Sequence, residues 1–307
     1  MKGKHFINIS DFTAQELRAI LDVAEELKTK QRDSVPHELL AGKTLAMLFE
    51  KTSTRTRVSF EVGMHQLGGH ALFLEYRTIQ IGGTGESIGD TARVISRYVD
   101  GIMARVYKHS SLEEMARNSI SPVINGLSDM GHPCQIMADL LTIKEEFGDL
   151  KGLRVAWIGD GNNVCNSLLI GCAKLGMDIT VATPVGYEPN IQYVATARDI
   201  AKESGSNVEV QNNPEQAVWH SDVIYTDTWV SMGDEAQQEE RLRVFQPYQV
   251  NISLVSKAKD SSIILHCLPA HRGYEITNEV IDGLHSRVWD QAENRLHTQK
   301  AIMSLTM

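Results

Sequence analysis

Short apolar runs alternate with helix-period segments along most of the chain, and this alternation restricts the possible folds more than any other feature. The runs lie at residues 44–49, 71–74, 102–105, 122–125, 153–158, 179–182, 208–210, 223–226 and 263–265. Strands that are buried on both faces, as in parallel sheets covered by helices, typically read in this way. The sequence therefore predicts an α/β protein whose sheets are mainly parallel and flanked by helices.

The chain of 307 residues is long enough for two domains that each bury a core of their own. The run Gly148-Asp149-Leu150-Lys151-Gly152 interrupts the pattern, which then restarts with the strand at 153–158. We therefore expect one domain over residues 1–147 and a second over residues 148–307. A final helix is expected at about 290–305.

Composition and charge narrow the possible partners. The formal net charge of -9 argues against binding to nucleic acid or to an anionic membrane surface. Since no apolar stretch approaches the roughly 20 residues that span a bilayer, and the first residues lack an apolar signal core, we expect a cytoplasmic protein. The four cysteines form no CxxC pair, which predicts neither a disulfide framework nor a zinc site.

The segment after the first apolar run has the character of an anion site. Ser53-Thr54-Arg55-Thr56-Arg57 stands where a strand gives way to a helix, so hydroxyls, guanidinium groups and unpaired backbone N–H groups converge there. An ordinary N-cap at Ser53 or Thr54 is the alternative. Arginine is unfavourable in a first helical turn, however, and Thr56 occupies the position where a capping box would have Glu. These features favour a phosphate site.

Polar residues also follow the strands of the second half, where sites in parallel sheets lie. Asn163, Asp227 and Cys267 each come after a predicted strand and are expected to face one crevice. The turn Gly159-Asp160-Gly161 also allows a dinucleotide site. That alternative is weak, because Val164 stands where the third glycine belongs and no acid follows the next strand.

Five motifs in order resemble the aspartate/ornithine carbamoyltransferase family, and specifically its ornithine branch. They are Ser53-Thr54-Arg55-Thr56-Arg57, His132-Pro133-Cys134-Gln135, Asp227-Thr228-Trp229-Val230-Ser231-Met232-Gly233, His266-Cys267-Leu268-Pro269-Ala270-His271-Arg272-Gly273 and Glu293-Asn294-Arg295-Leu296-His297. Together they cover nearly the whole chain. The resemblance implies a first domain that binds carbamoyl phosphate, a second that binds ornithine, and a last helix that packs back on the first domain.

The resemblance also assigns roles to single residues. The catalytic residues would be Arg105, His132, Asp227 and Cys267. Those that bind carbamoyl phosphate would be Ser53, Thr54, Arg55, Thr56, Gln80, Arg105, His132, Pro133, Cys134, Gln135, Cys267, Leu268 and Arg295. Those that bind ornithine would be Asn163, Asp227, Ser231 and Met232. Without the resemblance, Arg105 could equally be a surface charge and His132 a helix cap.

Carbamoyl transfer needs charge stabilisation and a neutral amine in line with the carbonyl carbon, so we expect no cofactor and no metal. Cys267 and Asp227 would assist deprotonation of the amine. A covalent thioester at Cys267 is a different interpretation; the adjacent His266 points to the opposite face if both lie on a strand. By the resemblance, the Leu268–Pro269 bond is cis.

The second substrate is decided at residues 227–233. Asp227 suits an ammonium group, whereas a second carboxylate, as in aspartate, would demand basic residues that the segment lacks. A putrescine enzyme would lack groups for an α-carboxylate, and Asn163 and Ser231 are present. A noncatalytic phosphate-binding or NAD-binding protein remains the alternative from another class.

The resemblance finally implies an assembly. Gln80 stands in a glycine-rich loop, residues 79–85, with no evident core anchor, yet it matches a family position that contacts carbamoyl phosphate in a neighbouring subunit. We therefore expect a homotrimer or a multiple of trimers.

Overall fold

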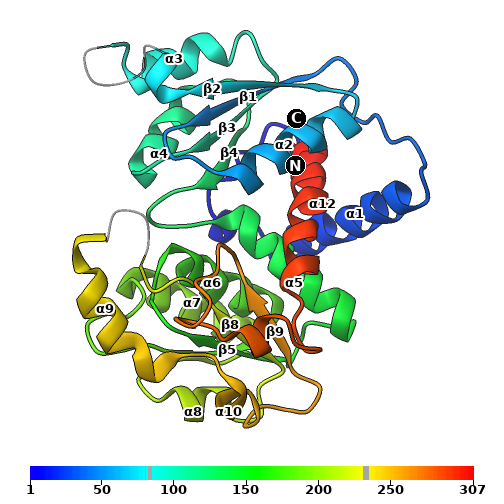
Figure 1. Ribbon diagram of the computed structural model, residues 1–307. Coiled ribbons are helices and arrows are strands. Elements are labelled where there is room, and N and C mark those ends of the chain that lie inside the picture. The colour runs from blue at the N-terminus through cyan, green and yellow to red at the C-terminus, as the bar shows by residue number, and fades with distance from the viewer. Residues whose placement is uncertain (80, 82–84, 231–234) are drawn as a thin grey trace. The chain divides into compact units, whose positions relative to one another are not determined.

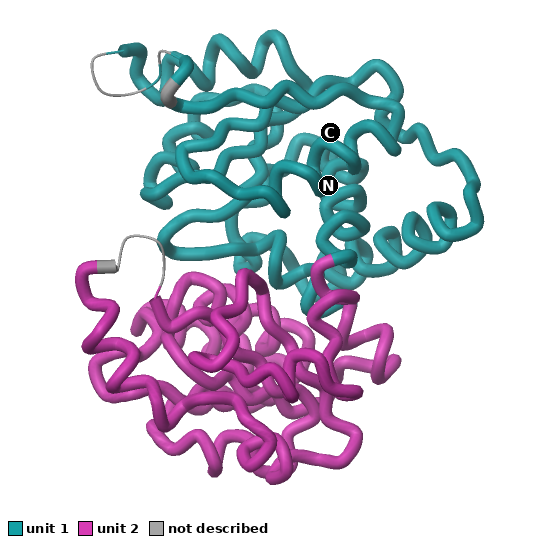
Figure 2. Tube along the Cα trace, viewed as in Figure 1, with its two compact units in different colours: residues 1–141, 293–307 teal, residues 142–292 magenta. Residues whose placement is uncertain are grey.

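The computed structural model describes residues 1–79, 81, 85–230 and 235–307. The chain forms two compact units, Met1–Leu141 with Glu293–Met307 and Thr142–Ala292 (Figure 2). The first unit therefore ends within the helix that we expected to close it at residue 147. It also includes the last fifteen residues, 293–307.

Unit 1 is built on a four-stranded parallel sheet in the order β2-β1-β3-β4 (Figure 1). Its elements are η1 (Ile9–Asp11), α1 (Ala14–Arg32), β1 (Thr44–Phe49), α2 (Thr54–Gln66), β2 (His70–Glu75), η2 (Tyr76–Thr78), α3 (Ile88–Ile95), β3 (Gly101–Arg105), α4 (His109–Asn118), β4 (Val123–Leu127) and the start of α5 (Pro133–Phe147), with most of α12 (Val288–Thr306). The strand order reverses at β1, which lies between β2 and β3. Ligands in such sheets bind where the order reverses, at the carboxyl ends of the strands.

Local sequence signals account for these elements. Thr13 and Glu16 form the capping box that opens α1, since the Thr13 hydroxyl accepts from the Glu16 N–H and the Glu16 carboxylate accepts from the Thr13 N–H. The residues of β1 from Leu45 to Phe49 are buried, as a central parallel strand requires. One expectation is wrong: the glycine-rich segment has a core anchor, because Ile81 is buried in the hydrophobic core of unit 1.

Unit 2 is built on a five-stranded parallel sheet in the order β7-β6-β5-β8-β9. Strands β5, β8 and β9 are labelled in Figure 1. Its elements are β5 (Arg154–Ile158), α6 (Asn163–Leu175), β6 (Asp178–Ala182), α7 (Ile191–Ser204), β7 (Val208–Gln211), α8 (Pro214–Val218), β8 (Val223–Thr226), η3 (Glu235–Gln237), α9 (Gln238–Phe245), η4 (Gln246–Tyr248), α10 (Ile252–Val255), β9 (Ile263–His266) and α11 (Asn278–Ile281). The order reverses at β5, between β6 and β8. The predicted α/β class with parallel sheets flanked by helices is confirmed.

The two faces of this sheet carry different residues, as the alternation along a strand requires. Ala156, Ile158 and Ile224 face a core shared with α8, α10 and α11. Trp157 and Tyr225 point to the other face and pack against each other with ring centroids 4.9 Å apart. Among the described residues, no helix is long and apolar enough to span a lipid bilayer.

Candidate active site

The start of α2 lies at the carboxyl end of β1, where the sheet of unit 1 reverses its order. Ser53 is the N-cap residue, and its hydroxyl accepts from the Thr56 N–H at 3.2 Å. The N-cap at Ser53, which the sequence analysis gave as the alternative to a phosphate site, is therefore present. It satisfies one of the first N–H groups of α2 and leaves the positive end of the helix dipole at this edge of the sheet.

The two arginines of the segment have different surroundings, although the sequence suggested that both converge on one volume. Arg55 lies near enough to His132 to depress its pKa. Arg57 instead donates from Nε to Glu61 at 3.1 Å, and its guanidinium stacks 3.8 Å from the centre of the Phe73 ring. The expectation that Arg57 joins the anion site is wrong, because its guanidinium instead binds Glu61 one helical turn later and stacks on Phe73 of β2.

Arg105 and His132 are buried, with exposed fractions of 6% and 4%. Arg105 is the last residue of β3, and because its side chain is buried it is not a surface charge. Burial lowers the pKa of His132 well below its ordinary value of 6.5, and Arg295, Arg105 and Arg55 lower it further. The imidazole is therefore neutral at physiological pH. A neutral imidazole beside cationic groups can donate an N–H hydrogen bond to a developing oxyanion and stay neutral while it does so.

Arg295 of α12 joins three helices of unit 1. Its Nη1 donates to Gln135 Oε1 of α5 at 2.9 Å, and its Nη2 donates to the Thr56 hydroxyl of α2 at 2.9 Å. Gln135 in turn donates from Nε2 to Asp139 at 2.8 Å, and this side-chain network is buried. The prediction that the last helix packs against the first domain is consistent with these contacts.

The remaining residues of the second motif have structural contacts. Pro133 begins α5, where its missing N–H costs nothing. The Cys134 thiol is fully buried and donates to the Asn125 carbonyl at 3.3 Å, and burial raises its pKa to about 12. Any contact of Cys134 with a substrate would therefore come from its backbone.

In unit 2, three strand ends bring polar side chains together. Asp227 follows β8, and its Oδ1 accepts from the Cys267 thiol, which follows β9, at 2.8 Å. Its Oδ2 accepts from Asn162 Nδ2 at 2.7 Å, at the end of β5. The sequence predicted that Asp227 and Cys267 meet. It did not single out Asn162, whose neighbour Asn163 is the first residue of α6.

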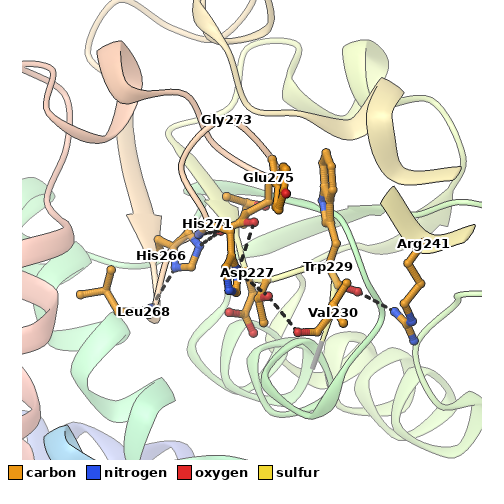
Figure 3. A network of polar contacts seen from close by, with 12 residues as sticks. Asp227, Trp229, Val230, Arg241, His266, Leu268, His271, Gly273 and Glu275 are labelled. Carbon is orange, nitrogen blue, oxygen red and sulfur yellow. Dashed lines mark hydrogen bonds and ion pairs between the residues drawn. The ribbon is translucent and has the colours of Figure 1, made fainter. Parts of the chain in front are cut away.

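The turn after Cys267 is stabilised by the buried pair of His266 and Glu275. His266 Nδ1 accepts from the Leu268 N–H at 2.9 Å, and its Nε2 lies 3.0 Å from Glu275 Oε1, which also accepts from the His271 N–H (Figure 3). Leu268 has φ of 58°, a left-handed conformation that a leucine rarely adopts. The Leu268–Pro269 bond is cis, as predicted. Cys267 follows β9 and is not part of it, and a ring nitrogen of His266 lies within 4.8 Å of the Cys267 sulfur, so the expectation that the two side chains point to opposite faces of a strand is wrong.

Hydrogen bonds hold residues 228–230, which follow Asp227. Arg241 of α9 donates from Nη1 to the Trp229 carbonyl at 2.8 Å (Figure 3). It also pairs with Asp160 at 3.2 Å. The hydroxyl of Thr228 donates to the Val230 carbonyl and lies 3.0 Å from His271 Nδ1. Because a hydroxyl has one proton, the His271 nitrogen is the donor in the second contact. Ser231 and Met232, like Gln80, lie outside the described residues.

Asp227, His266 and Cys267 each offer one ligand atom within 4.8 Å of the others, an arrangement that could hold a metal ion. Their contacts argue otherwise. Both ring nitrogens of His266 are engaged by Leu268 and Glu275, and the Cys267 thiol donates to Asp227. That the site binds no metal therefore stays a prediction.

Known proteins match this chain over nearly its full length. Residues 4–145 match the carbamoyl-P binding domain of the aspartate/ornithine carbamoyltransferases, and residues 151–306 match the Asp/Orn binding domain. An ornithine carbamoyltransferase of Carboxydothermus hydrogenoformans is 56% identical over 306 residues, which cover 100% of this chain and 98% of that protein.

Solved structures agree. The ornithine carbamoyltransferase of Pyrococcus furiosus has 54% identity and a TM-score of 0.97, with 100% of this chain and 97% of that chain covered. The anabolic enzyme of Campylobacter jejuni has 42% identity and a TM-score of 0.93, with 98% of each chain covered. By sequence, domain content and fold, this chain belongs to the aspartate/ornithine carbamoyltransferase family.

Proposed function

We propose that the protein is an ornithine carbamoyltransferase, which transfers the carbamoyl group of carbamoyl phosphate to the side-chain amine of L-ornithine and yields L-citrulline and phosphate. The observation that carries the choice of ornithine is the buried carboxylate of Asp227, which is 5% exposed and lies beside the Cys267 thiol. A carboxylate there attracts an amine and repels the second carboxylate of aspartate.

The phosphate is assigned to Ser53, Thr54, Arg55 and Thr56 at the start of α2, with Arg295. Backbone N–H groups, hydroxyls and guanidinium groups at a helix N-terminus are the usual partners of a phosphate. Thr56 and Arg295 are buried, whereas Ser53 and Arg55 are partly buried and Thr54 is exposed, so part of this set is open to a ligand. Pro133, Cys134 and Gln135 are assigned to the carbamoyl group of the same substrate, together with Leu268.

The carbonyl oxygen is assigned to Arg105, His132 and Thr56. When the amine nitrogen attacks the carbonyl carbon, negative charge develops on this oxygen, and donors already in place stabilise it. The neutral state of His132 suits this role, since its N–H group can donate while Arg105 supplies the charge. The bond from carbon to the phosphate oxygen then breaks, and phosphate leaves.

The attacking amine is assigned to Asp227 and Cys267, and the α-groups of ornithine to Asn163, Ser231 and Met232. The amine must lose a proton because only a neutral nitrogen has a lone pair for attack. The thiol and the carboxylate, 2.8 Å apart, form a pair through which this proton can pass. No cofactor is required for any step.

A homotrimer, or a multiple of trimers, belongs to the same proposal. Exposed apolar side chains support an interface on unit 1, since Val58 of α2 and Leu72 of the edge strand β2 are 51% and 40% exposed. The family position of Gln80 supports a loop that reaches a neighbouring subunit.

The substrate assignment is tested by offering carbamoyl phosphate with ornithine, putrescine, N-acetylornithine or aspartate to the purified protein and measuring the carbamoylated product. We expect kcat/KM for ornithine to exceed that for each other acceptor by at least about 100-fold, since each lacks or blocks a group that the site pairs. A preference for any other acceptor would refute the assignment. Asp227→Asn, which removes the charge that attracts the amine, should lower kcat/KM for ornithine, whereas Asp199→Asn, which changes an exposed acid of α7 paired with Lys202, should leave it unchanged.

A further inference from the structure

Asn162 uses both ends of its side chain. Its Oδ1 accepts from the backbone N–H groups of Val164 and Cys165 at 2.9 and 3.1 Å, which makes it the N-cap of α6. Its Nδ2 donates to Asp227 Oδ2 at 2.7 Å. The amide cannot be turned over, because its NH₂ group would then face two other donors. The helix therefore fixes the direction in which Nδ2 points.

Asp227 receives one donor on each oxygen, Asn162 on Oδ2 and the Cys267 thiol on Oδ1. The last torsion of an aspartate side chain is broad and roughly two-fold, so an unrestrained carboxylate turns freely. Two short contacts on opposite oxygens define its plane. Because the plane is fixed, the Oδ1 lone pair that accepts from the thiol points in one direction.

Within residues 1–79, 81, 85–230 and 235–307, the nearby charged groups Asp160 and His266 have partners of their own. At the end of β5, Asp160 is paired with Arg241 of α9. At the end of β9, His266 turns to Glu275. In the first turn of α6, the charges of Asp160 and Asp227 raise the pKa of the buried Cys165 thiol, after burial itself. Two acids thus lie near the start of α6, where the helix dipole presents its positive end.

We propose that Asn162 is a positioning residue for the reaction: it ties the Asp227 carboxylate to the start of α6 and so holds Oδ1 in the plane that meets the Cys267 thiol and the incoming amine. The role toward the amine rests on the proposed function. The role toward Cys267 does not.

The rival explanation is that Asn162 only caps α6. Two variants separate these roles. Asn162→Ser keeps an oxygen that caps well and removes the Nδ2 donor. Asn162→Asp also keeps the cap and sets a second carboxylate against Asp227.

Asn213 is the matched control. It caps α8 in the same way, accepting from the N–H groups of Glu215 and Gln216 at 3.0 and 3.2 Å, but it is exposed and its neighbourhood holds no reacting group. Asn213→Ser and Asn213→Asp therefore report the effect of a changed cap alone. Melting temperatures of all four variants check that they fold.

The kinetic test compares kcat/KM for ornithine with KM for carbamoyl phosphate. Loss of a hydrogen bond to a charged group should lower kcat/KM for ornithine by about 10- to 100-fold in Asn162→Ser and leave KM for carbamoyl phosphate within about twofold. In Asn162→Asp, two carboxylates repel each other. The acid limb of the plot of kcat/KM for ornithine against pH should therefore also move to higher pH, by about one pH unit. Equal losses for both substrates, or effects no larger than in the Asn213 pair, would overturn the proposal.

The second test is independent of the substrate. Cys267 is the partly exposed cysteine, and Cys134, Cys165 and Cys172 are buried, so iodoacetamide reports on Cys267 in the folded protein. Added negative charge disfavours the thiolate, so alkylation at about pH 8 should slow by about threefold or more in Asn162→Asp but not in Asn213→Asp. An unchanged rate would overturn the proposal. Slowing in a protein that forms no citrulline would refute the proposed function and support the positioning role.

Discussion

Arg295 and Thr56 stand 239 residues apart in the chain, yet Arg295 Nη2 donates to the Thr56 hydroxyl at 2.9 Å. The same guanidinium donates to Gln135. One planar group thus fixes the relative positions of α2, α5 and α12 within unit 1. A lysine has no such fork and holds its partners through a single flexible point charge.

The first prediction concerns Arg295→Lys. Because two directed contacts are replaced by one, we expect KM for carbamoyl phosphate to rise by about 10- to 100-fold, the cost of one or two hydrogen bonds from a charged donor. Arg57→Lys is the control, since Arg57 pairs with Glu61 on an exposed part of α2. Similar KM values in the two variants would contradict the role of Arg295.

The second prediction concerns pH and His132. Activity should rise from neutral to alkaline pH, since the ornithine amine must be neutral and a free alkylammonium has a pKa of about 10.4. Burial keeps the pKa of His132 well below 6.5, so its protonation should not contribute a limb in this range. His132→Asn should lower kcat by about 10²- to 10³-fold, the cost of one oxyanion donor, and leave the shape of the profile unchanged. A limb near pH 6 that vanishes in the variant would show that His132 titrates during the reaction.

The third prediction concerns the buried Lys300 of α12. Its Nζ lies 3.1 Å from Gln31 Oε1 and 3.1 Å from His37 Nε2, and burial lowers its pKa from 10.5 to about 8. Between these two pKa values the unfolded chain binds more protons than the folded one, so the contribution of Lys300 to stability rises with pH. Below about pH 8 the charged group is buried at a cost of about 3 kcal/mol.

The difference in unfolding free energy between wild type and Lys300→Met should therefore shift in favour of wild type by about 3 kcal/mol from pH 7 to pH 11. Denaturant titrations at several pH values measure it. Lys30→Met, which changes a partly exposed lysine of α1 that pairs with Glu26, should give a small and nearly constant difference. A constant difference for Lys300→Met would contradict its lowered pKa.

The sequence predicted those parts of the site that follow from local order. Ser53 caps α2 because a strand, a short loop and a helix follow one another there, and Arg105 lies at the end of β3 for the same reason. The contact of Arg295 with Thr56 has no local signal. Only the resemblance to a family predicted that the last helix packs near the phosphate residues, since helical periodicity does not specify a distant partner.

Three features were missed, each for a different reason. Asn162 carries a recognisable signal, an Asn before a helix-period segment, but its second contact depends on the adjacency of β5 and β8. Helix α7 was not assigned, although Asn190 caps it and Gly205 ends it with φ of 80°. Ile81 was taken for part of an unanchored loop, because the glycines around it hide a single buried side chain.

The fourth prediction concerns assembly. Arg55→Ala should weaken carbamoyl phosphate binding by several kcal/mol, since about 2–5 kcal/mol is lost when one partner of a buried charge pair is truncated. If Gln80 serves the site of an adjacent subunit, mixing inactive Gln80→Ala with inactive Arg55→Ala should restore part of the activity after subunits exchange. Mixtures that exchange and remain inactive would place the loop at its own chain's site. Full activity of Gln80→Ala alone would remove Gln80 from the site.

The most direct test of carbamoyl transfer follows the carbonyl carbon itself. Carbamoyl phosphate labelled with ¹³C is supplied with L-ornithine, and ¹³C and ³¹P NMR spectra are recorded as the protein turns over. The account predicts one new ureido carbon bonded to the side-chain nitrogen of ornithine, with one phosphate released for each carbon transferred. A ureido carbon on the α-nitrogen, or phosphate release without any new carbon–nitrogen bond, would contradict it.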